Sequence, residues 1–105
     1  MTKTIPSRVS RELKAKAGQV ADLLRVLAND RRLLILCRLV ECGEATVGRL
    51  ADDVELSQSA LSQHLARMRE EGLVAFRRDA QTLWYRIADP QVEDLLATLH
   101  RLYCR

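Results

Sequence analysis

The sequence lacks the features that mark membrane and secreted proteins. Its longest uninterrupted apolar run is Leu33–Cys37, which is far too short to span a bilayer. Lys3 and Arg8 near the N-terminus are not followed by an apolar core, so we expect no secretion signal. The odd number of cysteines, three, argues against a disulfide scaffold. We therefore expect a cytoplasmic protein whose cysteines are either buried small hydrophobes or reactive thiols.

Signatures of catalysis and of cofactor binding are also missing. The sequence contains no Cys-x-x-Cys, no glycine-rich phosphate loop and no clustered pair of catalytic carboxylates. The acidic residues within 52–55 and 70–71 are typical of solvated helix faces. We therefore expect no enzymatic activity and no cofactor.

The length and the distribution of charge point to one domain with a polyanionic partner. A chain of 105 residues predicts a single domain over residues 1–105. Its formal net charge is +3, but residues 1–28 carry +4 and residues 57–86 carry +2, whereas residues 29–56 carry −2. Positive charge in an N-terminal arm and in one internal segment suits nucleic acid.

Periodicity and capping residues predict four helices before Gly72. The first, at about residues 8–28, carries one apolar stripe. The second, at about residues 31–41, is apolar on nearly every side and should form the buried centre. Thr46 can cap a short third helix and Ser57 a fourth. Only a few residues separate the third helix from the fourth, which is the spacing of a helix-turn-helix.

An alternating pattern follows the four helices. Residues 73–78 and 82–87 predict two strands joined by a polar tip at 79–81. A basic hairpin directly after a helix-turn-helix is typical of a wing. Asp89 and Pro90 then begin a last helix. The predicted fold is therefore mainly α with a small β-hairpin, which is a winged helix-turn-helix.

The first and last predicted helices carry more apolar surface than one small domain needs. We expect these dimerisation helices, at about residues 8–28 and 90–105, to pair across a two-fold axis in a homodimer. The alternative is that both helices pack only on their own core.

The fourth predicted helix has two incompatible faces. At about 100° per residue, its apolar face consists of Leu61, Leu65 and Met68. The opposite face is short, uncharged at its centre and rich in hydrogen-bonding groups: Ser59, Ser62, Gln63 and Ala66, with Arg67 at its edge. Small polar side chains flanked by arginine suit a surface that enters a DNA groove and contacts base edges. A winged helix used only for protein contacts is a weaker alternative.

Four segments, in this order, resemble the ArsR/SmtB family of winged-helix repressors: Leu27–Leu36, Leu56–Leu65, Gly72–Val74 and Thr82–Ile87. The resemblance covers roughly residues 20–104. It implies a homodimer that represses transcription by occupying an operator in double-stranded DNA and that leaves the operator when an effector binds. Two-fold symmetry predicts that this operator is an inverted repeat.

Position and family resemblance together assign a set of DNA-binding residues: Ser57, Gln58, Ser59, Ser62, Gln63, His64, Arg67, Arg77, Arg78, Gln81 and Thr82. Gln58 and Gln63 are the best base readers, because an amide can bond bidentately to adenine. The arginines are expected to hold phosphates or, in the wing, to enter the minor groove.

Two of the cysteines resemble those of the sulfide- and persulfide-responsive branch of that family (BigR/SqrR/HlyU-like). Cys37 follows Ile35-Leu36 in the second predicted helix, and Cys104 lies near the end of the last one. The resemblance implies that the two can be joined by a polysulfide bridge, with reactive sulfur species or an oxidant as inducer. Our hypothesis is that Cys104 reacts first and Cys37 resolves it. An extra residue within 40–45 and the additional Cys42, which we interpret as a bystander, depart from the pattern.

Metal sensing is the rival chemistry. His100 and Cys104 are four residues apart on one helical face, which is a valid ligand spacing, and Cys37 could be a third ligand. Against this reading, the third predicted helix holds no cysteine, where metal sensors of the family often carry a cysteine-rich motif.

Overall fold

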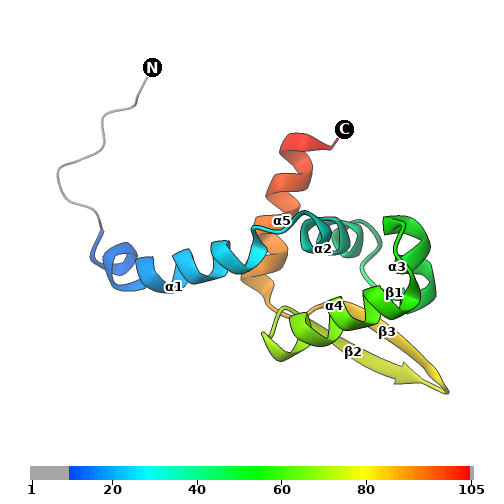
Figure 1. Cartoon of the computed structure of the whole chain (residues 1–105). Helices are drawn as coiled ribbons and strands as arrows, with labels where there is room; N and C mark the ends of the chain where they lie inside the picture. Colours follow the sequence, from blue (N-terminus) through cyan, green and yellow to red (C-terminus); the bar gives the residue numbers. More distant parts are fainter. Residues whose placement is uncertain (1–9, 105) are drawn as a thin grey trace.

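The computed structural model describes residues 10–104, which form five helices and three strands (Figure 1). In chain order the elements are α1 (Arg11–Leu27), α2 (Asp30–Cys42), β1 (Ala45–Thr46), α3 (Val47–Val54), α4 (Gln58–Glu70), β2 (Val74–Asp79), β3 (Thr82–Ile87) and α5 (Pro90–Tyr103). The predicted winged helix-turn-helix is confirmed. The first predicted helix was expected from about residue 8; residues 8, 9 and 105 of the two dimerisation helices lie outside the described part of the chain.

Each helix begins directly after a side chain that accepts a hydrogen bond from a backbone N–H of its first turn. The caps, at 2.9 to 3.2 Å, are Ser10, Asn29, Thr46, Ser57 and Asp89. They satisfy amide groups that have no partner inside the helix. At the other end of α2, Gly43 adopts a φ of +80°, a left-handed conformation that favours glycine and ends the helix.

The three strands form one antiparallel sheet in the order β1-β3-β2. The β2–β3 hairpin pairs Val74 with Ile87 at its base and Asp79 with Thr82 at its tip. The predicted hairpin is thus confirmed, and the sheet has one strand more than expected. β1 pairs only two residues with β3, which is too short a segment to show an alternating pattern in the sequence.

The core lies around α2, as predicted. The side chains with no more than 1% exposure come from α2, α3, α4 and α5. They are Ile35, Leu36, Leu39, Leu50, Leu61, Leu65, Met68, Val92 and Leu96. Because α2 contacts α3, α5 and β3, it connects the helix-turn-helix to the last helix. None of the helices between residues 10 and 104 is long and apolar enough to cross a membrane.

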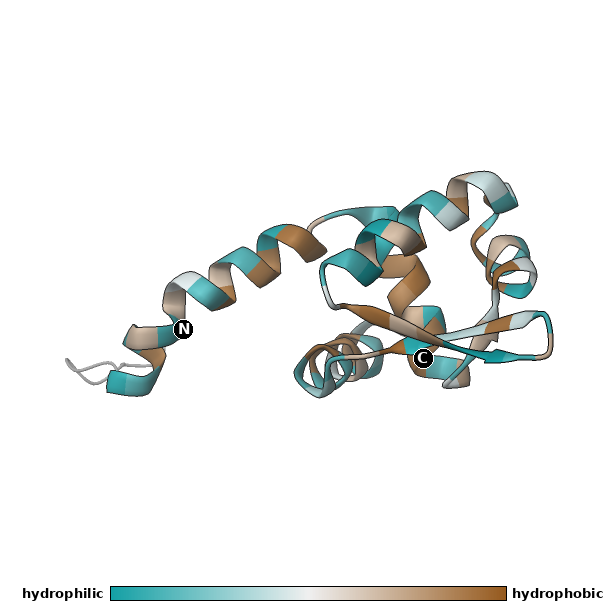
Figure 2. Ribbon diagram, turned by 90° about the horizontal axis from the view of Figure 1, so that it is seen from below, coloured by the Kyte–Doolittle hydropathy of each residue, from teal (hydrophilic) through white to brown (hydrophobic). Residues whose placement is uncertain are grey.

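Helix α1 extends away from this core, and its apolar stripe is left open to solvent (Figures 1 and 2). Only Leu27 at its C-terminal end is buried. Further apolar side chains are exposed elsewhere, so that the large exposed hydrophobic residues of the described chain are Leu13, Val20, Leu24, Leu34, Leu102 and Tyr103. The alternative in which the first helix packs only on its own core does not describe α1, whereas α5 does bury Val92 and Leu96.

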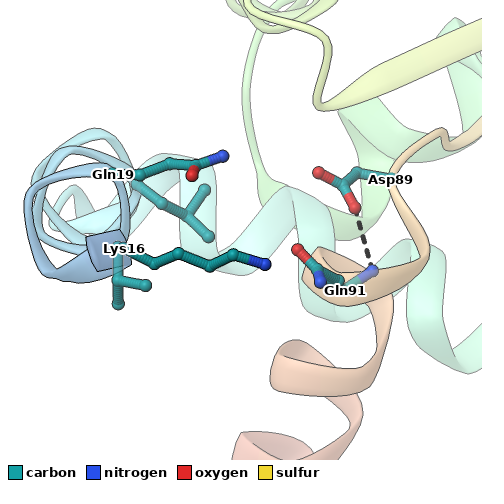
Figure 3. A pocket seen from close by; sticks show the side chains of 6 residues that line it. Lys16, Gln19, Asp89 and Gln91 are labelled. Atoms are coloured by element: carbon teal, nitrogen blue, oxygen red, sulfur yellow. Dashed lines mark hydrogen bonds between the residues drawn. The ribbon is translucent and has the colours of Figure 1, made fainter. Parts of the chain in front are cut away.

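A hollow of about 310 Å³ separates α1 from the start of α5 (Figure 3). Lys16 and Gln19 of α1 point across it toward Asp89 and Gln91. Asp89 is already engaged as the cap of α5, where it accepts from the Gln91 amide. Helix α1 therefore meets the rest of the domain mainly through its last turns, where Leu23, Val26 and Leu27 pack against the core.

A half-buried ion pair fixes the C-terminal end of α4 against α1 and α2. The Arg32 side chain is 12% exposed and donates to Glu71 at 2.6 Å and to the carbonyl oxygen of Val26 at 3.3 Å. It thereby joins the end of α1, the start of α2 and the residue that follows α4. Charge-assisted hydrogen bonds of this kind are stronger than neutral ones.

We expect Arg32→Ala to lower the free energy of unfolding by roughly 1–3 kcal/mol, because it removes a charged donor and leaves Glu71 without its partner. Urea unfolding followed by circular dichroism measures this change. The control is Arg25→Ala, which breaks an ion pair with Asp22 whose side chains are 73% and 75% exposed. That exposed pair should contribute less than about 1 kcal/mol. Equal losses in the two variants would contradict the assigned role of Arg32.

Candidate nucleic-acid interface and thiol site

Helices α3 and α4 form the predicted helix-turn-helix. Between them, Glu55 takes a left-handed φ of +58° and the Leu56 amide donates back to the Ala51 carbonyl at 3.0 Å. The half-buried Leu56 packs against the core and fixes the turn. Helix α4 then buries its apolar face, which leaves the opposite face in solvent as the sequence predicts.

The structure places the predicted DNA-binding residues of α4 together on this solvent face. Ser57, Gln58, Ser59, Ser62, Gln63 and Arg67 are all exposed, and His64 is half-buried. The Ser57 hydroxyl is engaged as the helix cap, so it lies at the positive end of the helix dipole, where phosphate is favoured. The Gln58 amide lies close to Gly48 of α3, with its nitrogen 3.6 Å from the position a Cβ would take there.

Ala60, Gln63, His64 and Arg67 line a shallow hollow of about 150 Å³ on the same face of α4. The hollow combines an amide, an imidazole and a guanidinium around a small apolar floor. This set of donors and acceptors is suited to a base edge together with an adjacent phosphate. Of the two predicted base readers, Gln63 is the one that lines this hollow.

The two wing arginines point to opposite faces of the sheet, because successive strand residues alternate. Arg77 lies over the Trp84 ring at 5.5 Å and donates from Nε and Nη2 to the carboxylate of Glu44, at 2.8 and 2.9 Å. These bonds hold the pKa of Glu44 below its ordinary value and raise the pKa of Arg77. Arg78 makes no ion pair with any residue between 10 and 104.

The remaining predicted wing residues, Gln81 and Thr82, are exposed at the hairpin tip. Ala80 adjoins them with a left-handed φ of +56°. The wing therefore presents Arg78, Gln81 and Thr82 freely, whereas Arg77 is already held by a carboxylate. Glu44 is thus a residue of this surface that the sequence prediction missed, and no local pattern links it to a partner 33 positions away.

Cys37 lies on α2 and Cys104 follows the last turn of α5, and these two helices contact each other within one chain. Cys37 lies half-buried on α2 against the core, and Cys104 is exposed as the C-terminal cap of α5. Burial raises the pKa of the Cys37 thiol, and the neighbouring Cys104 and Glu41 raise it further. A raised pKa leaves less thiolate at neutral pH than an ordinary cysteine has, so burial slows Cys37 as a nucleophile.

Cys42 is exposed in the last turn of α2, where its Sγ donates to the Arg38 carbonyl at 3.1 Å. This bond lies within its own helix and joins it to no other element. The interpretation of Cys42 as a bystander at a helix end agrees with this position.

His100, the third residue of the rival metal site, is engaged elsewhere. Its Nε2 lies 2.8 Å from a carboxylate oxygen of Glu41 on α2. This bond is the main reason that the pKa of Glu41 is below its ordinary value, and a second bond, from Arg38, lowers the pKa further. Among residues 10–104, no group of three or more histidine, cysteine or acidic residues is arranged to hold a metal ion.

Comparison with known proteins places the chain among transcription regulators. Residues 29–75 match the family described as bacterial regulatory protein, arsR family. The chain is 47% identical over 94 residues to the transcriptional activator HlyU of Vibrio cholerae serotype O1, covering 90% of this chain and 86% of that protein. It is 35% identical over 101 residues to the biofilm growth-associated repressor of Xylella fastidiosa, covering 96% and 88%.

Solved structures agree with these relatives. Reduced HlyU from Vibrio cholerae has a TM-score of 0.81 at 46% identity and covers 91% of this chain and 100% of that one. The antimony-specific transcriptional repressor AntR has a TM-score of 0.81 at 35% identity and covers 97% and 94%. These proteins are transcription regulators rather than enzymes.

Proposed function

Because this chain belongs to the arsR family of bacterial regulatory proteins, and is therefore a DNA-binding transcription regulator, we propose that it is a repressor with a dithiol switch. In this proposal the reduced homodimer occupies an inverted-repeat operator. A reaction that joins Cys37 to Cys104 lowers its affinity for that operator. The observation that carries the proposal is the placement of two unbonded thiols on helices that contact each other, Cys37 on α2 and Cys104 at the end of α5.

The exposed apolar side chains support the homodimer. Leu13, Val20 and Leu24 on α1 and Leu102 and Tyr103 on α5 are left in water in a single chain. A second copy that covers both helices would bury them and would present two α4 helices related by a two-fold axis. Half-sites about one helical turn apart, or a multiple of it, would fit such a pair. The partner is operator DNA in the cytoplasm.

The proposed chemistry balances with a low-molecular-weight persulfide as the oxidant. The Cys104 thiolate attacks the outer sulfur of glutathione persulfide, which forms a Cys104 persulfide and releases glutathione. The Cys37 thiolate then attacks the sulfur bonded to Cys104 Cβ and expels hydrosulfide, so one glutathione persulfide closes a disulfide. Each further glutathione persulfide inserts one sulfur and releases one glutathione. Inserted sulfurs, at about 2 Å each, relax the short separation that a direct disulfide demands.

Mass spectrometry of the intact protein tests the proposal. Reduced protein is mixed in parallel with glutathione persulfide, hydrogen peroxide and Zn(II), and operator binding is measured on the same samples. We expect the persulfide to add the mass of two sulfurs less two hydrogens and to release the operator. Loss of two hydrogens alone, in every oxidising arm, would replace persulfide sensing by general redox sensing. Unmodified thiols together with unchanged operator affinity would overturn the proposal.

The similarity to a repressor described as antimony-specific supports a second candidate, which is metal or metalloid sensing through Cys37, His100 and Cys104. The thiol switch fits better, because His100 is bonded to Glu41. Adding Sb(III) to the parallel experiment separates the two. A retained metal or metalloid in native spray, with release of operator and no added sulfur, would favour the second candidate.

A further inference from the structure

A continuous series of polar side chains connects the end of α5 to the helix-turn-helix. His100 of α5 bonds to one carboxylate oxygen of Glu41 at 2.8 Å, and the other oxygen accepts from Arg38 Nη1 at 3.1 Å. Arg38 also donates from Nε to Asp53 of α3 at 2.6 Å. Arg49 of α3 approaches the same Asp53 oxygen at 3.9 Å. The series therefore crosses from α5 to α2 and from α2 to α3.

We propose that the series His100–Glu41–Arg38–Asp53 couples bridging of Cys37 and Cys104 to the position of α3. Through α3 it would change the orientation of α4, the proposed DNA-reading helix. The proposal rests on the thiol switch proposed above and adds the residues through which bridging would change operator affinity. Each of the four is proposed as a positioning residue, which acts through its neighbours in the series rather than on DNA or on the reacting sulfurs.

The first link moves with Cys104. Cys104 follows His100 by one helical turn, and its backbone N–H donates to the His100 carbonyl at 2.8 Å. Because this bond joins Cys104 to the last turn of α5, we expect that drawing its sulfur toward Cys37 displaces that turn, which carries His100. The partner of His100, Glu41, lies one turn beyond Cys37 on α2, so the bridge and the polar contact span the same pair of helices.

The second link is a competition for one guanidinium. Arg38 serves two carboxylates at once, Glu41 on its own helix and Asp53 on α3. When His100 moves away, Glu41 keeps only its bond to Arg38, and the attraction between Glu41 and Arg38 becomes stronger. The side chains of Arg38, Glu41 and Asp53 are 28% to 40% exposed, so this competition is only partly screened by water. A shift of Arg38 toward Glu41 lengthens its bond to Asp53, which removes a contact that holds α3 against α2.

The third link is direct packing. Helix α3 contacts α4 as the first half of the helix-turn-helix, and Leu50, Ala51 and Val54 of α3 are buried in the shared core. A small displacement of α3 therefore changes the orientation of α4. Among residues 10–104, the ion pair that includes a residue of α5 is His100–Glu41, and it belongs to the series. The Arg32–Glu71 and Arg77–Glu44 pairs join other elements.

The test measures coupling rather than affinity. Operator dissociation constants are determined for the reduced and the fully bridged protein, and their ratio is taken for wild type, Glu41→Gln and Asp53→Asn. We expect a wild-type ratio of roughly 5- to 150-fold. The ratio should fall by roughly 2- to 30-fold in each variant, because each breaks the series at a different joint. The matched control is Asp22→Asn, the same acid-to-amide change in the exposed pair on α1, which should leave the ratio unchanged.

Two features of the design keep its outcomes distinct. Glu41 also raises the pKa of Cys37, so Glu41→Gln should speed bridge formation; a ratio taken on fully bridged protein, verified by mass, does not depend on that rate. Asp53 lies on α3, so Asp53→Asn still breaks the series and tests the inference if Glu41→Gln fails to fold. A wild-type ratio of one would remove the thiol switch itself. A large wild-type ratio that survives in both folded variants would leave the switch standing and overturn this inference.

Discussion

Cys104→Ser is expected to bind the operator as tightly as the parent protein and to keep it after treatment with glutathione persulfide. The parent should lose roughly 5- to 150-fold in affinity under the same treatment. Serine is close to cysteine in size, and Cys104 is an exposed helix cap, so the change should not disturb the fold. It does remove the sulfur on which the proposed bridge begins. Fluorescence anisotropy with labelled operator, before and after treatment, measures both affinities.

The other two cysteines complete this test. Cys37→Ser should also stop the response, but it should still accept sulfur on Cys104 as an open persulfide, detectable by intact mass. Cys42→Ser is the matched control: its thiol bonds only within α2, so the variant should respond as the parent does. A Cys104→Ser protein that still releases DNA on persulfide treatment would end the dithiol proposal.

Gln63→Ala is expected to weaken binding to the operator by roughly 1–3 kcal/mol, or about 5- to 150-fold, while binding to unrelated duplex DNA stays nearly constant. Gln63 is exposed on α4 and lines the hollow beside Arg67, where its amide can bond to a base edge. The removal of a base contact costs sequence discrimination, whereas the phosphate contacts that supply non-specific affinity remain. Competition titrations with operator and scrambled duplexes measure both quantities.

The control for this second result is Gln91→Ala, the same truncation at an exposed position at the start of α5. It should alter neither affinity. If Gln63→Ala discriminates operator from scrambled DNA as well as the parent does, α4 does not read bases through this residue, and the assignment of its exposed face is wrong.

Local patterns in the sequence predict the helices and the hairpin because each depends on nearby residues. The capping side chains Asn29, Thr46 and Ser57 act on amides three positions away, and alternation in β2 and β3 depends on immediate neighbours. The two-residue strand β1 offers no such period, so the third strand was not predicted.

Contacts between distant residues were beyond local patterns. His100 and Glu41 are 59 positions apart, and Arg77 and Glu44 are 33 apart, and each pair forms only because α2 packs near α5 or β3 lies between β1 and β2. The sequence therefore pointed to the two thiols and to the exposed polar face of α4, but it did not reveal the carboxylates Glu41 and Glu44 that bond to His100 and Arg77. The exposure of α1 could not be predicted for the same reason. Its apolar stripe indicates that another surface should cover the helix, but it does not show which surface that is.

The Glu44–Arg77 pair has a consequence for how such a protein searches a chromosome. A guanidinium already neutralised by a carboxylate displaces fewer condensed cations from a duplex than a free one does. Of the two arginines predicted to bind DNA from the wing, only Arg78 is then unpaired among the described residues. Under the proposed function, the protein therefore spends less time on unrelated DNA, and a larger share of it stays available for the operator.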